Sequence, residues 1–350
     1  MDAAKQLVIN IVTWNSARFL PRIFESLDAQ TSKAFTVTVI DNGSTDGTVA
    51  WLEANRSDVT VLRNRKNFGF SRAHNQGISL ARSRWESVGD LEKKYIFILN
   101  PDTFLHERCV EEVIAYMDAH PDVEIAGPKL LRAFRIADRE DGSADYEQTN
   151  IIDSTGISIL KSRKFVDRGA GEEDHGQYDG VEPFGISGAA LVLRASAIPL
   201  VAEHDAVVFD EEIFAYKEDA DLAWRLRLFG GKAALIVPAI VWHQRLAKAS
   251  KSNGPIGLVS SQFGRSSFVN MLSRRNKMWM EWKNDDWSSR LMHLPWRIFD
   301  LFIRAISLIF PAQLKGAIQA WVGLPMILKK RKEVAARRKL SVEAMRKWFV

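Results

Sequence analysis

The first half of the chain alternates short apolar runs with segments of helical spacing. The apolar runs are rich in β-branched and aromatic residues and are bounded by polar turns, which is typical of buried strands. The expected strands are residues 7–13, 36–40, 59–62 and 95–99, and the expected helices are residues 17–30, 47–55, 71–84 and 107–120. Strands and helices in alternation predict an α/β fold, with a mostly parallel sheet that carries helices on both faces.

The pattern changes in the second half. Residues 134–180 are rich in Asp, Glu, Gly, Arg and Ser, so we expect an irregular insertion there. Regular patterning returns with an apolar run at 186–194, a helix at 218–228 and a strand at 234–237. From residue 264 onward, helical stretches carry Trp, Leu, Ile and Phe on one side and Arg or Lys on the other. We therefore divide the chain into a domain of residues 1–263 and a helical, basic region of residues 264–350.

The formal net charge of +5 is unevenly distributed along the chain. From Arg274 to the C-terminus, 17 basic residues stand against 6 acidic ones, so this part carries +11 and the rest −6. The same part holds six of the eleven tryptophans. Trp and Phe suit the headgroup boundary of a bilayer, and each Lys or Arg near acidic lipid contributes about 1 kcal/mol. This composition favours binding at an anionic membrane surface; the alternative is a helical bundle packed on the first domain with a solvated basic face.

Other features of the sequence bear on compartment and partners. Cys109 is the single cysteine, which excludes an internal disulfide and fits a reducing compartment. The N-terminal apolar run is short and no basic stretch precedes it, so we expect no secretory signal. A membrane crossing needs about 20 mostly apolar residues, and the best candidate, 294–328, is interrupted by charged residues. No nucleic-acid recognition motif accompanies the positive charge. We expect a cytoplasmic protein.

Polar residues follow directly after each expected strand of the first half, at 13–15, 41–44, 64–67 and 100–102. Ligands of parallel sheets bind beyond these carboxyl ends. Asp41 ends the second strand and opens the segment Asp-Asn-Gly-Ser-Thr-Asp-Gly. The Asn-Gly and Asp-Gly pairs are typical of a turn, but a turn does not explain why an acid ends the strand. A carboxylate there could accept the N3–H of a pyrimidine ring, and both interpretations stay open.

Asp102 follows the buried strand at 95–99 in the segment Asn-Pro-Asp. Because Pro101 cannot continue the sheet, the chain leaves it there and points Asp102 outward. The carboxylate suits a Mg²⁺ or Mn²⁺ ion that bridges two phosphates, or it caps a helix that begins near residue 105. His243 lies near a later strand end. A lone histidine is more typical of a structural role, but beside Asp102 it would complete a metal shell.

Three acids, Glu218, Asp219 and Asp221, stand within four positions at the start of the helix expected at 218–228. The helix dipole favours acids in a first turn, and this accounts for one or two of them. A carboxylate at a helix start next to a cleft could instead remove a proton from an attacking hydroxyl, which is general base catalysis.

Together these residues resemble glycosyltransferase family 2, the inverting enzymes of the GT-A fold, over roughly Leu7 to His243. The resemblance rests on several motifs in order and at the family's spacing. They are Ile-Val-Thr-Trp-Asn at 11–15, Val-Ile-Asp-Asn-Gly-Ser-Thr-Asp-Gly at 39–47, Asn-Phe-Gly-Phe-Ser-Arg-Ala-His-Asn at 67–75, Leu-Asn-Pro-Asp at 99–102, Gly-Ala at 188–189 and Glu-Asp-Ala-Asp-Leu at 218–222. Within the family they look most like the bacterial rhamnosyltransferase-type branch that builds cell-surface glycans.

The resemblance implies roles in nucleotide binding for four positions. Asp41, together with Thr13 at the neighbouring strand end, would bind the pyrimidine of a nucleotide sugar. Asn67 and Asn75 fall in the segment that would line the nucleotide pocket.

The resemblance also implies a metal site and a catalytic base. Asp102 and His243 would hold a Mg²⁺ or Mn²⁺ ion, and Asp219 would be the base. The family's metal motif is Asp-X-Asp, and here Asn100 takes its first position, which leaves Asp102 as the only acidic ligand in the motif and implies weaker metal affinity. The 134–180 segment and three residues would lie toward the acceptor: Gly188, Glu218 and Asp221.

The activity implied by the resemblance is an inverting transfer of a sugar from a pyrimidine-diphosphate donor, such as dTDP-L-rhamnose, to a glycan or lipid-linked glycan. The expected setting is the inner face of the plasma membrane, with the basic C-terminal region as a peripheral anchor. Two alternatives remain. One is transfer to polyprenyl phosphate, and the other is a non-catalytic nucleotide-sugar-binding or membrane-scaffolding protein.

Overall fold

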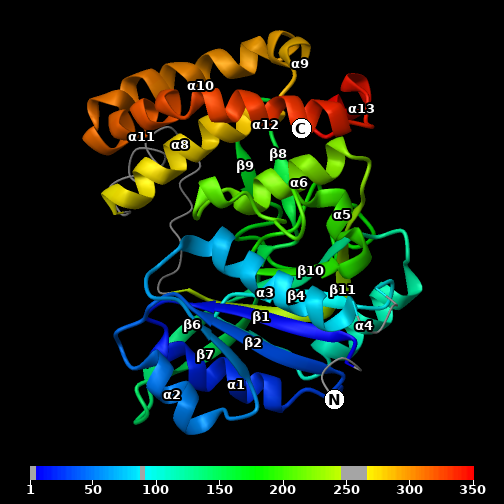
Figure 1. Cartoon of the computed structure of the whole chain (residues 1–350), viewed down its shortest axis with the longest axis vertical. Helices are drawn as coiled ribbons and strands as arrows, with labels where there is room; N and C mark the ends of the chain where they lie inside the picture. The colour runs from blue at the N-terminus through cyan, green and yellow to red at the C-terminus, as the bar shows by residue number, and fades with distance from the viewer. Residues whose placement is uncertain (1–4, 87–90, 246–265) are drawn as a thin grey trace.

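A computed structural model describes residues 5–86, 91–245 and 266–350, and it confirms the alternation expected for the first half (Figure 1). Four parallel strands lie side by side in the order β3-β2-β1-β4. These strands are β1 (Leu7–Thr13), β2 (Phe35–Asp41), β3 (Thr60–Arg63) and β4 (Tyr95–Leu99). The intervening helices are η2 (Ala17–Phe19), α1 (Leu20–Asp28), α2 (Thr48–Asn55), α3 (Gly69–Glu86) and α4 (Cys109–Ala119).

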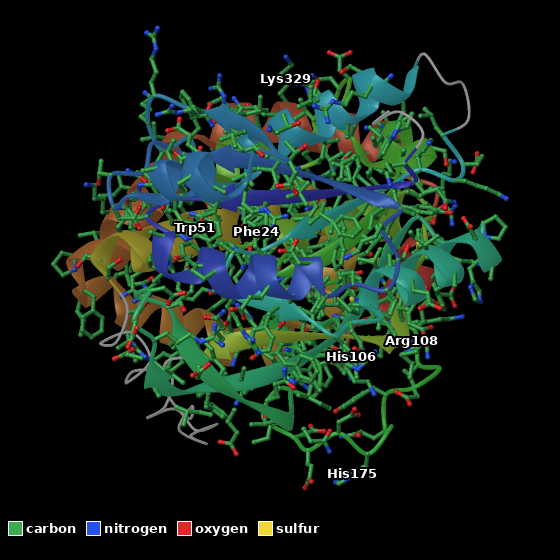
Figure 2. The ribbon with its side chains drawn as sticks, turned by 90° about the horizontal axis from the view of Figure 1, so that it is seen from below. Phe24, Trp51, His106, Arg108, His175 and Lys329 are labelled. Carbon is green, nitrogen blue, oxygen red and sulfur yellow. The ribbon has the colours of Figure 1, made fainter. Side chains whose placement is uncertain are left out.

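The sequence of β1 explains why helices cover both faces of the sheet. Successive side chains of a strand point to opposite faces. Leu7, Ile9 and Ile11 therefore join the cluster that contains the apolar face of α1, whereas Val8 joins the cluster of α3. All four side chains are buried. On the α1 side, Phe24 of α1 stacks on Trp51 of α2 with ring centroids 5.7 Å apart (Figure 2).

The sheet continues beyond β4 with strands that follow β4 in the sequence, in the order β10-β6-β11-β5. These strands are β5 (Thr103–Leu105), β6 (Ile125–Asp138), β10 (Ala190–Arg194) and β11 (Ala233–Arg245). β10 runs antiparallel to both of its neighbours, while β6 and β11 are parallel to each other. The run expected at 186–194 contains β10, and the strand expected at 234–237 is part of the longer β11.

The expectation of an irregular insertion at 134–180 is wrong over much of its length. β6 extends to Asp138 and pairs antiparallel with β7 (Ala144–Ser154), so this polar stretch is part of the central sheet. Its polar composition reflects exposure, because most of the first eight side chains of β7 are exposed or half-buried. β8 (Ile157–Ile159) and β9 (Phe165–Asp167) form a second, two-stranded sheet. Whether this segment binds an acceptor stays a prediction.

Further short helices connect the second half: η3 (Ala195–Ala197), α5 (Ile198–Val201) and η4 (Glu211–Ile213). The helix expected at 218–228 is α6 (Glu218–Leu228). The C-terminal region is helical, as expected, and forms the end of the molecule away from β1 and β2 (Figure 1). It contains α8 (Ser267–Asn284), α9 (Trp287–Met292), α10 (Leu294–Ile306), η5 (Ser307–Ile309), α11 (Pro311–Val322), α12 (Leu324–Arg337) and α13 (Val342–Arg346). The boundary expected at residue 263 lies outside the described residues.

The C-terminal helices are packed on the part of the chain that forms the sheet, and their charges are not all solvated. Lys283 of α8 is buried against Asp221 of α6, with Nζ 2.9 Å from Oδ2. Asp285 is buried against Arg163, which lies between β8 and β9, at 3.0 Å. The solvated basic face of the alternative interpretation is therefore not found at Lys283, because ion pairing draws this side chain inward, whereas Lys329 and Lys332 are exposed. In the described part of the chain no single helix has the length and apolar character of a membrane span, and Leu294–Ile309 and Pro311–Val322 meet these criteria only together, bent by 113°.

Candidate active site

The polar residues that follow the first strands meet at one edge of the sheet, as the sequence predicted. Thr13 is paired in register with Asp41, and Asp41 with Arg63, so β1, β2 and β3 end together. Beyond this edge lies a cavity of about 810 Å³. Its polar walls come from Asn42, Asn67, Asn100 and Asp102, and its aromatic walls from Trp14, Phe19, Phe70, Phe214, Tyr216 and Phe268. The cavity joins strand ends from the first half to residues of the C-terminal region.

Asp41 lies behind this cavity wall and is almost fully buried. Its Oδ1 accepts hydrogen bonds from the hydroxyls of Thr13, at 3.0 Å, and Ser44, and its Oδ2 accepts from the backbone N–H groups of Gly43 and Ser44. An ionised carboxylate offers about four acceptor positions. The four donors use these positions to hold the turn, so a pyrimidine N3–H at Asp41 would have to replace one of them.

Asp102 and His243 are brought together although 140 positions separate them in the sequence. His243 of β11 is paired with Thr103 of β5, directly after Asp102, and its Nε2 lies 3.3 Å from Oδ1 of Asp102. On the other side of the ring, Nδ1 lies 2.9 Å from Oδ2 of Asp153 on β7. Because a carboxylate only accepts, Nδ1 carries a hydrogen and Nε2 is presented toward Asp102.

The donor set of this pair fits a divalent cation. A carboxylate oxygen and an imidazole nitrogen are ligands that Mn²⁺ accepts, and Mg²⁺ or Mn²⁺ commonly binds one or two protein groups plus phosphate oxygens. Asp153 supplies the outer hydrogen bond that orients a ligating histidine. Across residues 5–86, 91–245 and 266–350, no group of three or more His, Cys, Asp and Glu side chains is arranged to hold an ion. Asp102 and His243 would therefore need phosphate oxygens to complete a shell.

Asp219 lies at the start of α6, near the same cavity. The backbone N–H of Gly188 donates to its Oδ2 at 3.1 Å, and the N–H of Ala220 donates to its Oδ1 at 2.7 Å. A Cβ added to Gly188 would lie 3.3 Å from the Phe70 ring and 3.5 Å from the Cβ of Asp219, so Gly188 lets both approach. Phe70 lines the cavity, whereas Asp219 is not one of its lining residues and approaches it only through Gly188, which lies between the two side chains.

Glu218 is buried immediately beside Asp219. Burial, together with the negative charge of Asp219, raises the pKa of Glu218 to about 8. Its Oε2 has no hydrogen-bond partner among the described residues. Glu218 is therefore protonated at neutral pH and cannot act as a second base beside Asp219.

Two other predicted residues lie in structural networks. The side-chain amide of Asn75 donates to the carbonyl of Phe209 and accepts from the N–H groups of Val208 and Phe209, and it lines a different cavity, which also contains Arg72. Asp221 is fully buried and bound by Arg225, Lys283 and Asn284. The structure thus places Asn75 and Asp221 away from the cleft, whereas Asn67 lines it and accepts from the N–H of Gly69.

The sequence reasoning missed a residue that shapes the cavity from the C-terminal region. The backbone of Phe214, Tyr216 and Lys217 has positive φ, a conformation that residues other than glycine rarely adopt. The amide nitrogen of Asn276 on α8 donates to the carbonyls of Ile213, Ala215 and Tyr216, each at 2.9 Å. Asn276 is fully buried, so α8 holds this loop against the cavity. Nothing in the local sequence of α8 indicated this contact.

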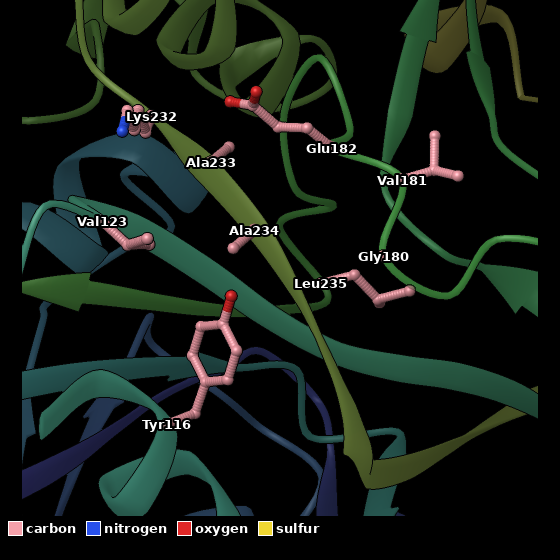
Figure 3. Close-up of a pocket in the computed structure, with 9 residues that line it drawn as sticks. All are labelled: Tyr116, Val123, Gly180, Val181, Glu182, Lys232, Ala233, Ala234 and Leu235. Carbon is pink, nitrogen blue, oxygen red and sulfur yellow. The ribbon is translucent and has the colours of Figure 1, made fainter. Parts of the chain in front are cut away.

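A smaller cavity of about 190 Å³ lies elsewhere on the sheet, between Tyr116 of α4, the start of β11 and the segment around Glu182 (Figure 3). Its labelled side chains are mostly apolar, with Lys232 and Glu182 at one end. None of the predicted site residues lines it, and we assign it no role in the chemistry.

Known proteins share both the sequence pattern and the fold. Residues 8–166 match the family described as Glycosyl transferase family 2. N-acetylglucosaminyl-diphospho-decaprenol L-rhamnosyltransferase from two strains of Mycobacterium tuberculosis is 24% identical over 282 residues, which cover 78% of this chain and 86% of the relative. An uncharacterized glycosyltransferase of Haemophilus influenzae is 30% identical over 118 residues, or 33% of this chain and 36% of the relative.

Among solved structures, GalNAc-T7 with UDP, GalNAc and Mn²⁺ superposes with a TM-score of 0.55 at 13% identity, over 80% of this chain and 48% of that one. The sheet with its cleft beyond the carboxyl ends of β1, β2 and β4 therefore has the GT-A fold. The chain is a glycosyltransferase, and its residues 8–166 match glycosyltransferase family 2.

Proposed function

We propose that this enzyme transfers a sugar from a pyrimidine-diphosphate donor, such as dTDP-L-rhamnose, to a lipid-linked glycan at the inner face of the plasma membrane, with inversion at the anomeric carbon. The observation that carries the proposal is the Asp102–His243 pair, which is oriented by Asp153 and joined to the polar strand ends around one cavity. The relative from Mycobacterium tuberculosis supports a rhamnosyl donor and a lipid-linked acceptor, because its name states both.

Asp102 and His243 would bind the divalent cation together with the donor diphosphate. When bound, the cation stabilises the negative charge that develops on the leaving diphosphate. Asp153 accepts from Nδ1 of His243, so that Nε2 is the ring nitrogen that would offer its lone pair to a bound cation. Asn42, Asn67 and Asn100 supply amide groups that can hydrogen-bond the donor within the cavity.

Asp219 serves as the general base in the proposed reaction. The acceptor hydroxyl loses its proton to the carboxylate while its oxygen attacks the anomeric carbon, and the bond from that carbon to the diphosphate oxygen breaks. One displacement inverts the centre. The two backbone N–H groups at Gly188 and Ala220 hold the carboxylate in place, and neutral Glu218 adds no competing charge.

Replacement of Asp219 by Asn tests the proposal. We expect Asp219→Asn to lower turnover by about 10²- to 10⁴-fold, the usual contribution of a positioned general base. Calorimetric affinity for dTDP with Mn²⁺ should change little, because the diphosphate and the cation are held by Asp102 and His243. Turnover is measured with dTDP-L-rhamnose and a lipid-linked acceptor.

Asp205→Asn is the matched control, since this carboxylate is 96% exposed. It should leave both turnover and dTDP affinity unchanged. Turnover by Asp219→Asn at the level of this control would remove Asp219 as the base. Binding of dTDP by the unmodified protein without turnover of any pyrimidine-diphosphate sugar would favour the non-catalytic alternative.

A further inference from the structure

The outer helices of the C-terminal region present an apolar surface, which we call the α9–α11 face and define as the exposed side chains of residues 287–322. It includes Trp287, Trp296, Ile298, Phe299, Phe302 and Trp321. Within 287–322, all of which the structure describes, Lys315 carries the one exposed charge. Monomeric soluble proteins rarely expose contiguous apolar patches of this kind, and such patches mark an interaction site.

The amphipathic order of α10 is the reverse of that in an ordinary surface helix. Its charged residues Arg297, Asp300 and Arg304 recur at helical spacing and point toward α8. There Arg297 pairs with Glu281 at 3.3 Å, and Arg304 pairs with Glu281 at 2.5 Å. The opposite side of α10 is apolar and faces outward. A helix on the surface of a protein in water directs its charged side chains toward the solvent. The outward side of α10 is apolar instead, so this helix is suited to a surrounding that is less polar than the side facing α8.

Asp300 completes the inward charge cluster of α10. It pairs with Lys277 of α8 at 3.1 Å and with Arg304 at 2.5 Å. Both basic residues of α10 and Lys277 are therefore neutralised within the helical region and are not available to anionic lipid. The attraction between basic residues and acidic headgroups, which the sequence favoured as the basis of membrane binding, cannot come from these side chains.

We propose that the α9–α11 face inserts into one leaflet of a phospholipid bilayer, so that acyl chains cover it. The chemistry of the surface fits this partner. Trp287 opens the first of these helices and Trp321 lies at the end of the last, and tryptophan prefers the boundary between headgroups and acyl chains. Lys315 and, on α12, Lys329 and Lys332 are exposed and can reach lipid phosphates. Binding then depends on buried apolar area, with only a minor contribution from charge.

The α9–α11 face is joined to the cavity through the packing of α8. α8 packs against α11 and α12, and the first turn of α8 supplies Phe268 and Val269 to the cavity wall. Insertion would therefore place the cavity close to the membrane surface, where a lipid-linked acceptor resides. The inference does not rest on the proposed reaction, because lipid binding can be measured without donor or acceptor.

Vesicle flotation of the full-length protein tests the inference. We expect it to float with vesicles of phosphatidylcholine alone and with vesicles that contain phosphatidylglycerol, and to lose little binding between 0.1 and 1 M NaCl, because salt screens charges but not apolar burial. The variant Ile298→Gln/Phe302→Gln should lower the partition coefficient by about tenfold or more. These two side chains are 58% and 59% exposed, so the fold should tolerate the change.

Two control variants and one measurement separate the alternatives. Ile136→Gln/Val181→Gln replaces side chains that are 66% and 52% exposed on other elements, and it should float like the unmodified protein. One outcome would overturn the inference in favour of binding to headgroup charge. In it, flotation requires phosphatidylglycerol and disappears in 1 M NaCl, and Lys329→Gln/Lys332→Gln abolishes it while Ile298→Gln/Phe302→Gln does not. Absence of flotation would also overturn it, and a dimer in sedimentation velocity that Ile298→Gln/Phe302→Gln dissociates would identify a second copy as the partner.

Discussion

The imidazole of His243 is held between two carboxylates that have different roles. Asp153 is buried, and it is also bound by Arg132 at 3.2 Å, so it is fixed before any ligand arrives. Asp102 is a third exposed and borders the cavity, so it can bind a ligand from solution. Because Asp153 is fixed on one side of the ring and Asp102 lies on the other, the imidazole of His243 is held in one orientation.

The protonation of Glu218 leads to a prediction about stability and pH. Its pKa in the folded protein, about 8, lies above the ordinary value of 4.5. Between these two pH values the folded state holds a proton that the unfolded state has released, so the stability that this group contributes is fully present below pH 4.5 and is lost as pH rises toward 8. Glu218→Gln removes the titration. We expect the free energy of unfolding of the unmodified protein to fall relative to that of Glu218→Gln by up to about 1.4 kcal/mol per pH unit.

Urea unfolding at pH 5, 6.5 and 8 measures this difference. Glu147→Gln is a suitable control, because it neutralises an exposed carboxylate on β7. If the unfolding free energies of Glu218→Gln and of the unmodified protein change in parallel over this range, Glu218 is already ionised in the folded state.

At the scale of elements, the first four strands and the carboxyl edge of the sheet could be predicted because the information is local. Buried strands are apolar, turns are polar, and the edge at which parallel strands end is fixed by topology. Asp153 could not be found in this way, since β7 has the polar composition of an exposed sheet extension. Its role depends on the pairing of β6 with β7 and with β11, which no short window of sequence specifies. The inward position of the charged side chains of α10 could not be predicted either, because helical spacing separates a polar and an apolar face but does not say which of them is buried.

The contact between α8 and the loop at 213–217 predicts an effect on the cavity from a residue outside the family 2 domain. Asn276→Ala removes a side-chain donor from three backbone carbonyls, of which that of Ile213 still accepts from Arg275 and from the N–H of Ala215. We expect a cost of about 1–3 kcal/mol in the free energy of unfolding. The positive φ values at Phe214 and Tyr216 then lose their support. We expect weaker binding of dTDP with Mn²⁺, because these residues line the cavity.

Calorimetry for dTDP affinity and thermal unfolding for stability check this prediction side by side. Ser273→Ala on the same helix is the control and should alter neither. Unchanged dTDP affinity in a destabilised Asn276→Ala protein would restrict Asn276 to a structural role.

For the whole molecule, buried charges join the catalytic half to the C-terminal helices. Lys283 of α8 contacts Asp210, which caps η4, at 2.5 Å and Asp221 of α6 at 2.9 Å, and Lys330 of α12 also pairs with Asp210. Burial acts to raise the pKa of Asp210 and Asp221, but the positive charge of Lys283, together with that of Lys330 at Asp210 and of Arg225 at Asp221, outweighs it, and both pKa values are lowered. The helix that begins next to Asp219 is thus held by the same side chain that holds α8. We expect the two halves to unfold in one cooperative transition.

Lys283→Met tests this coupling. The substitution leaves two buried carboxylates short of a positive partner, and removal of one member of a buried ion pair typically costs about 3–5 kcal/mol. Because Asp210 and Asp221 have lowered pKa values, their stabilisation is present above the unfolded-state value of about 3.8 and is lost as pH falls through the folded-state values. The variant should therefore be much less stable than the unmodified protein at pH 7.5, and the difference in stability should narrow as pH falls below about 3.8. Urea unfolding followed by tryptophan fluorescence reports on both halves.

Lys329→Met is the control. It replaces an exposed lysine of α12, so the free energy of unfolding should change little. If Lys283→Met loses no more stability than Lys329→Met, or if the C-terminal helices of the unmodified protein unfold in a step separate from the rest, the buried charges do not join the two halves.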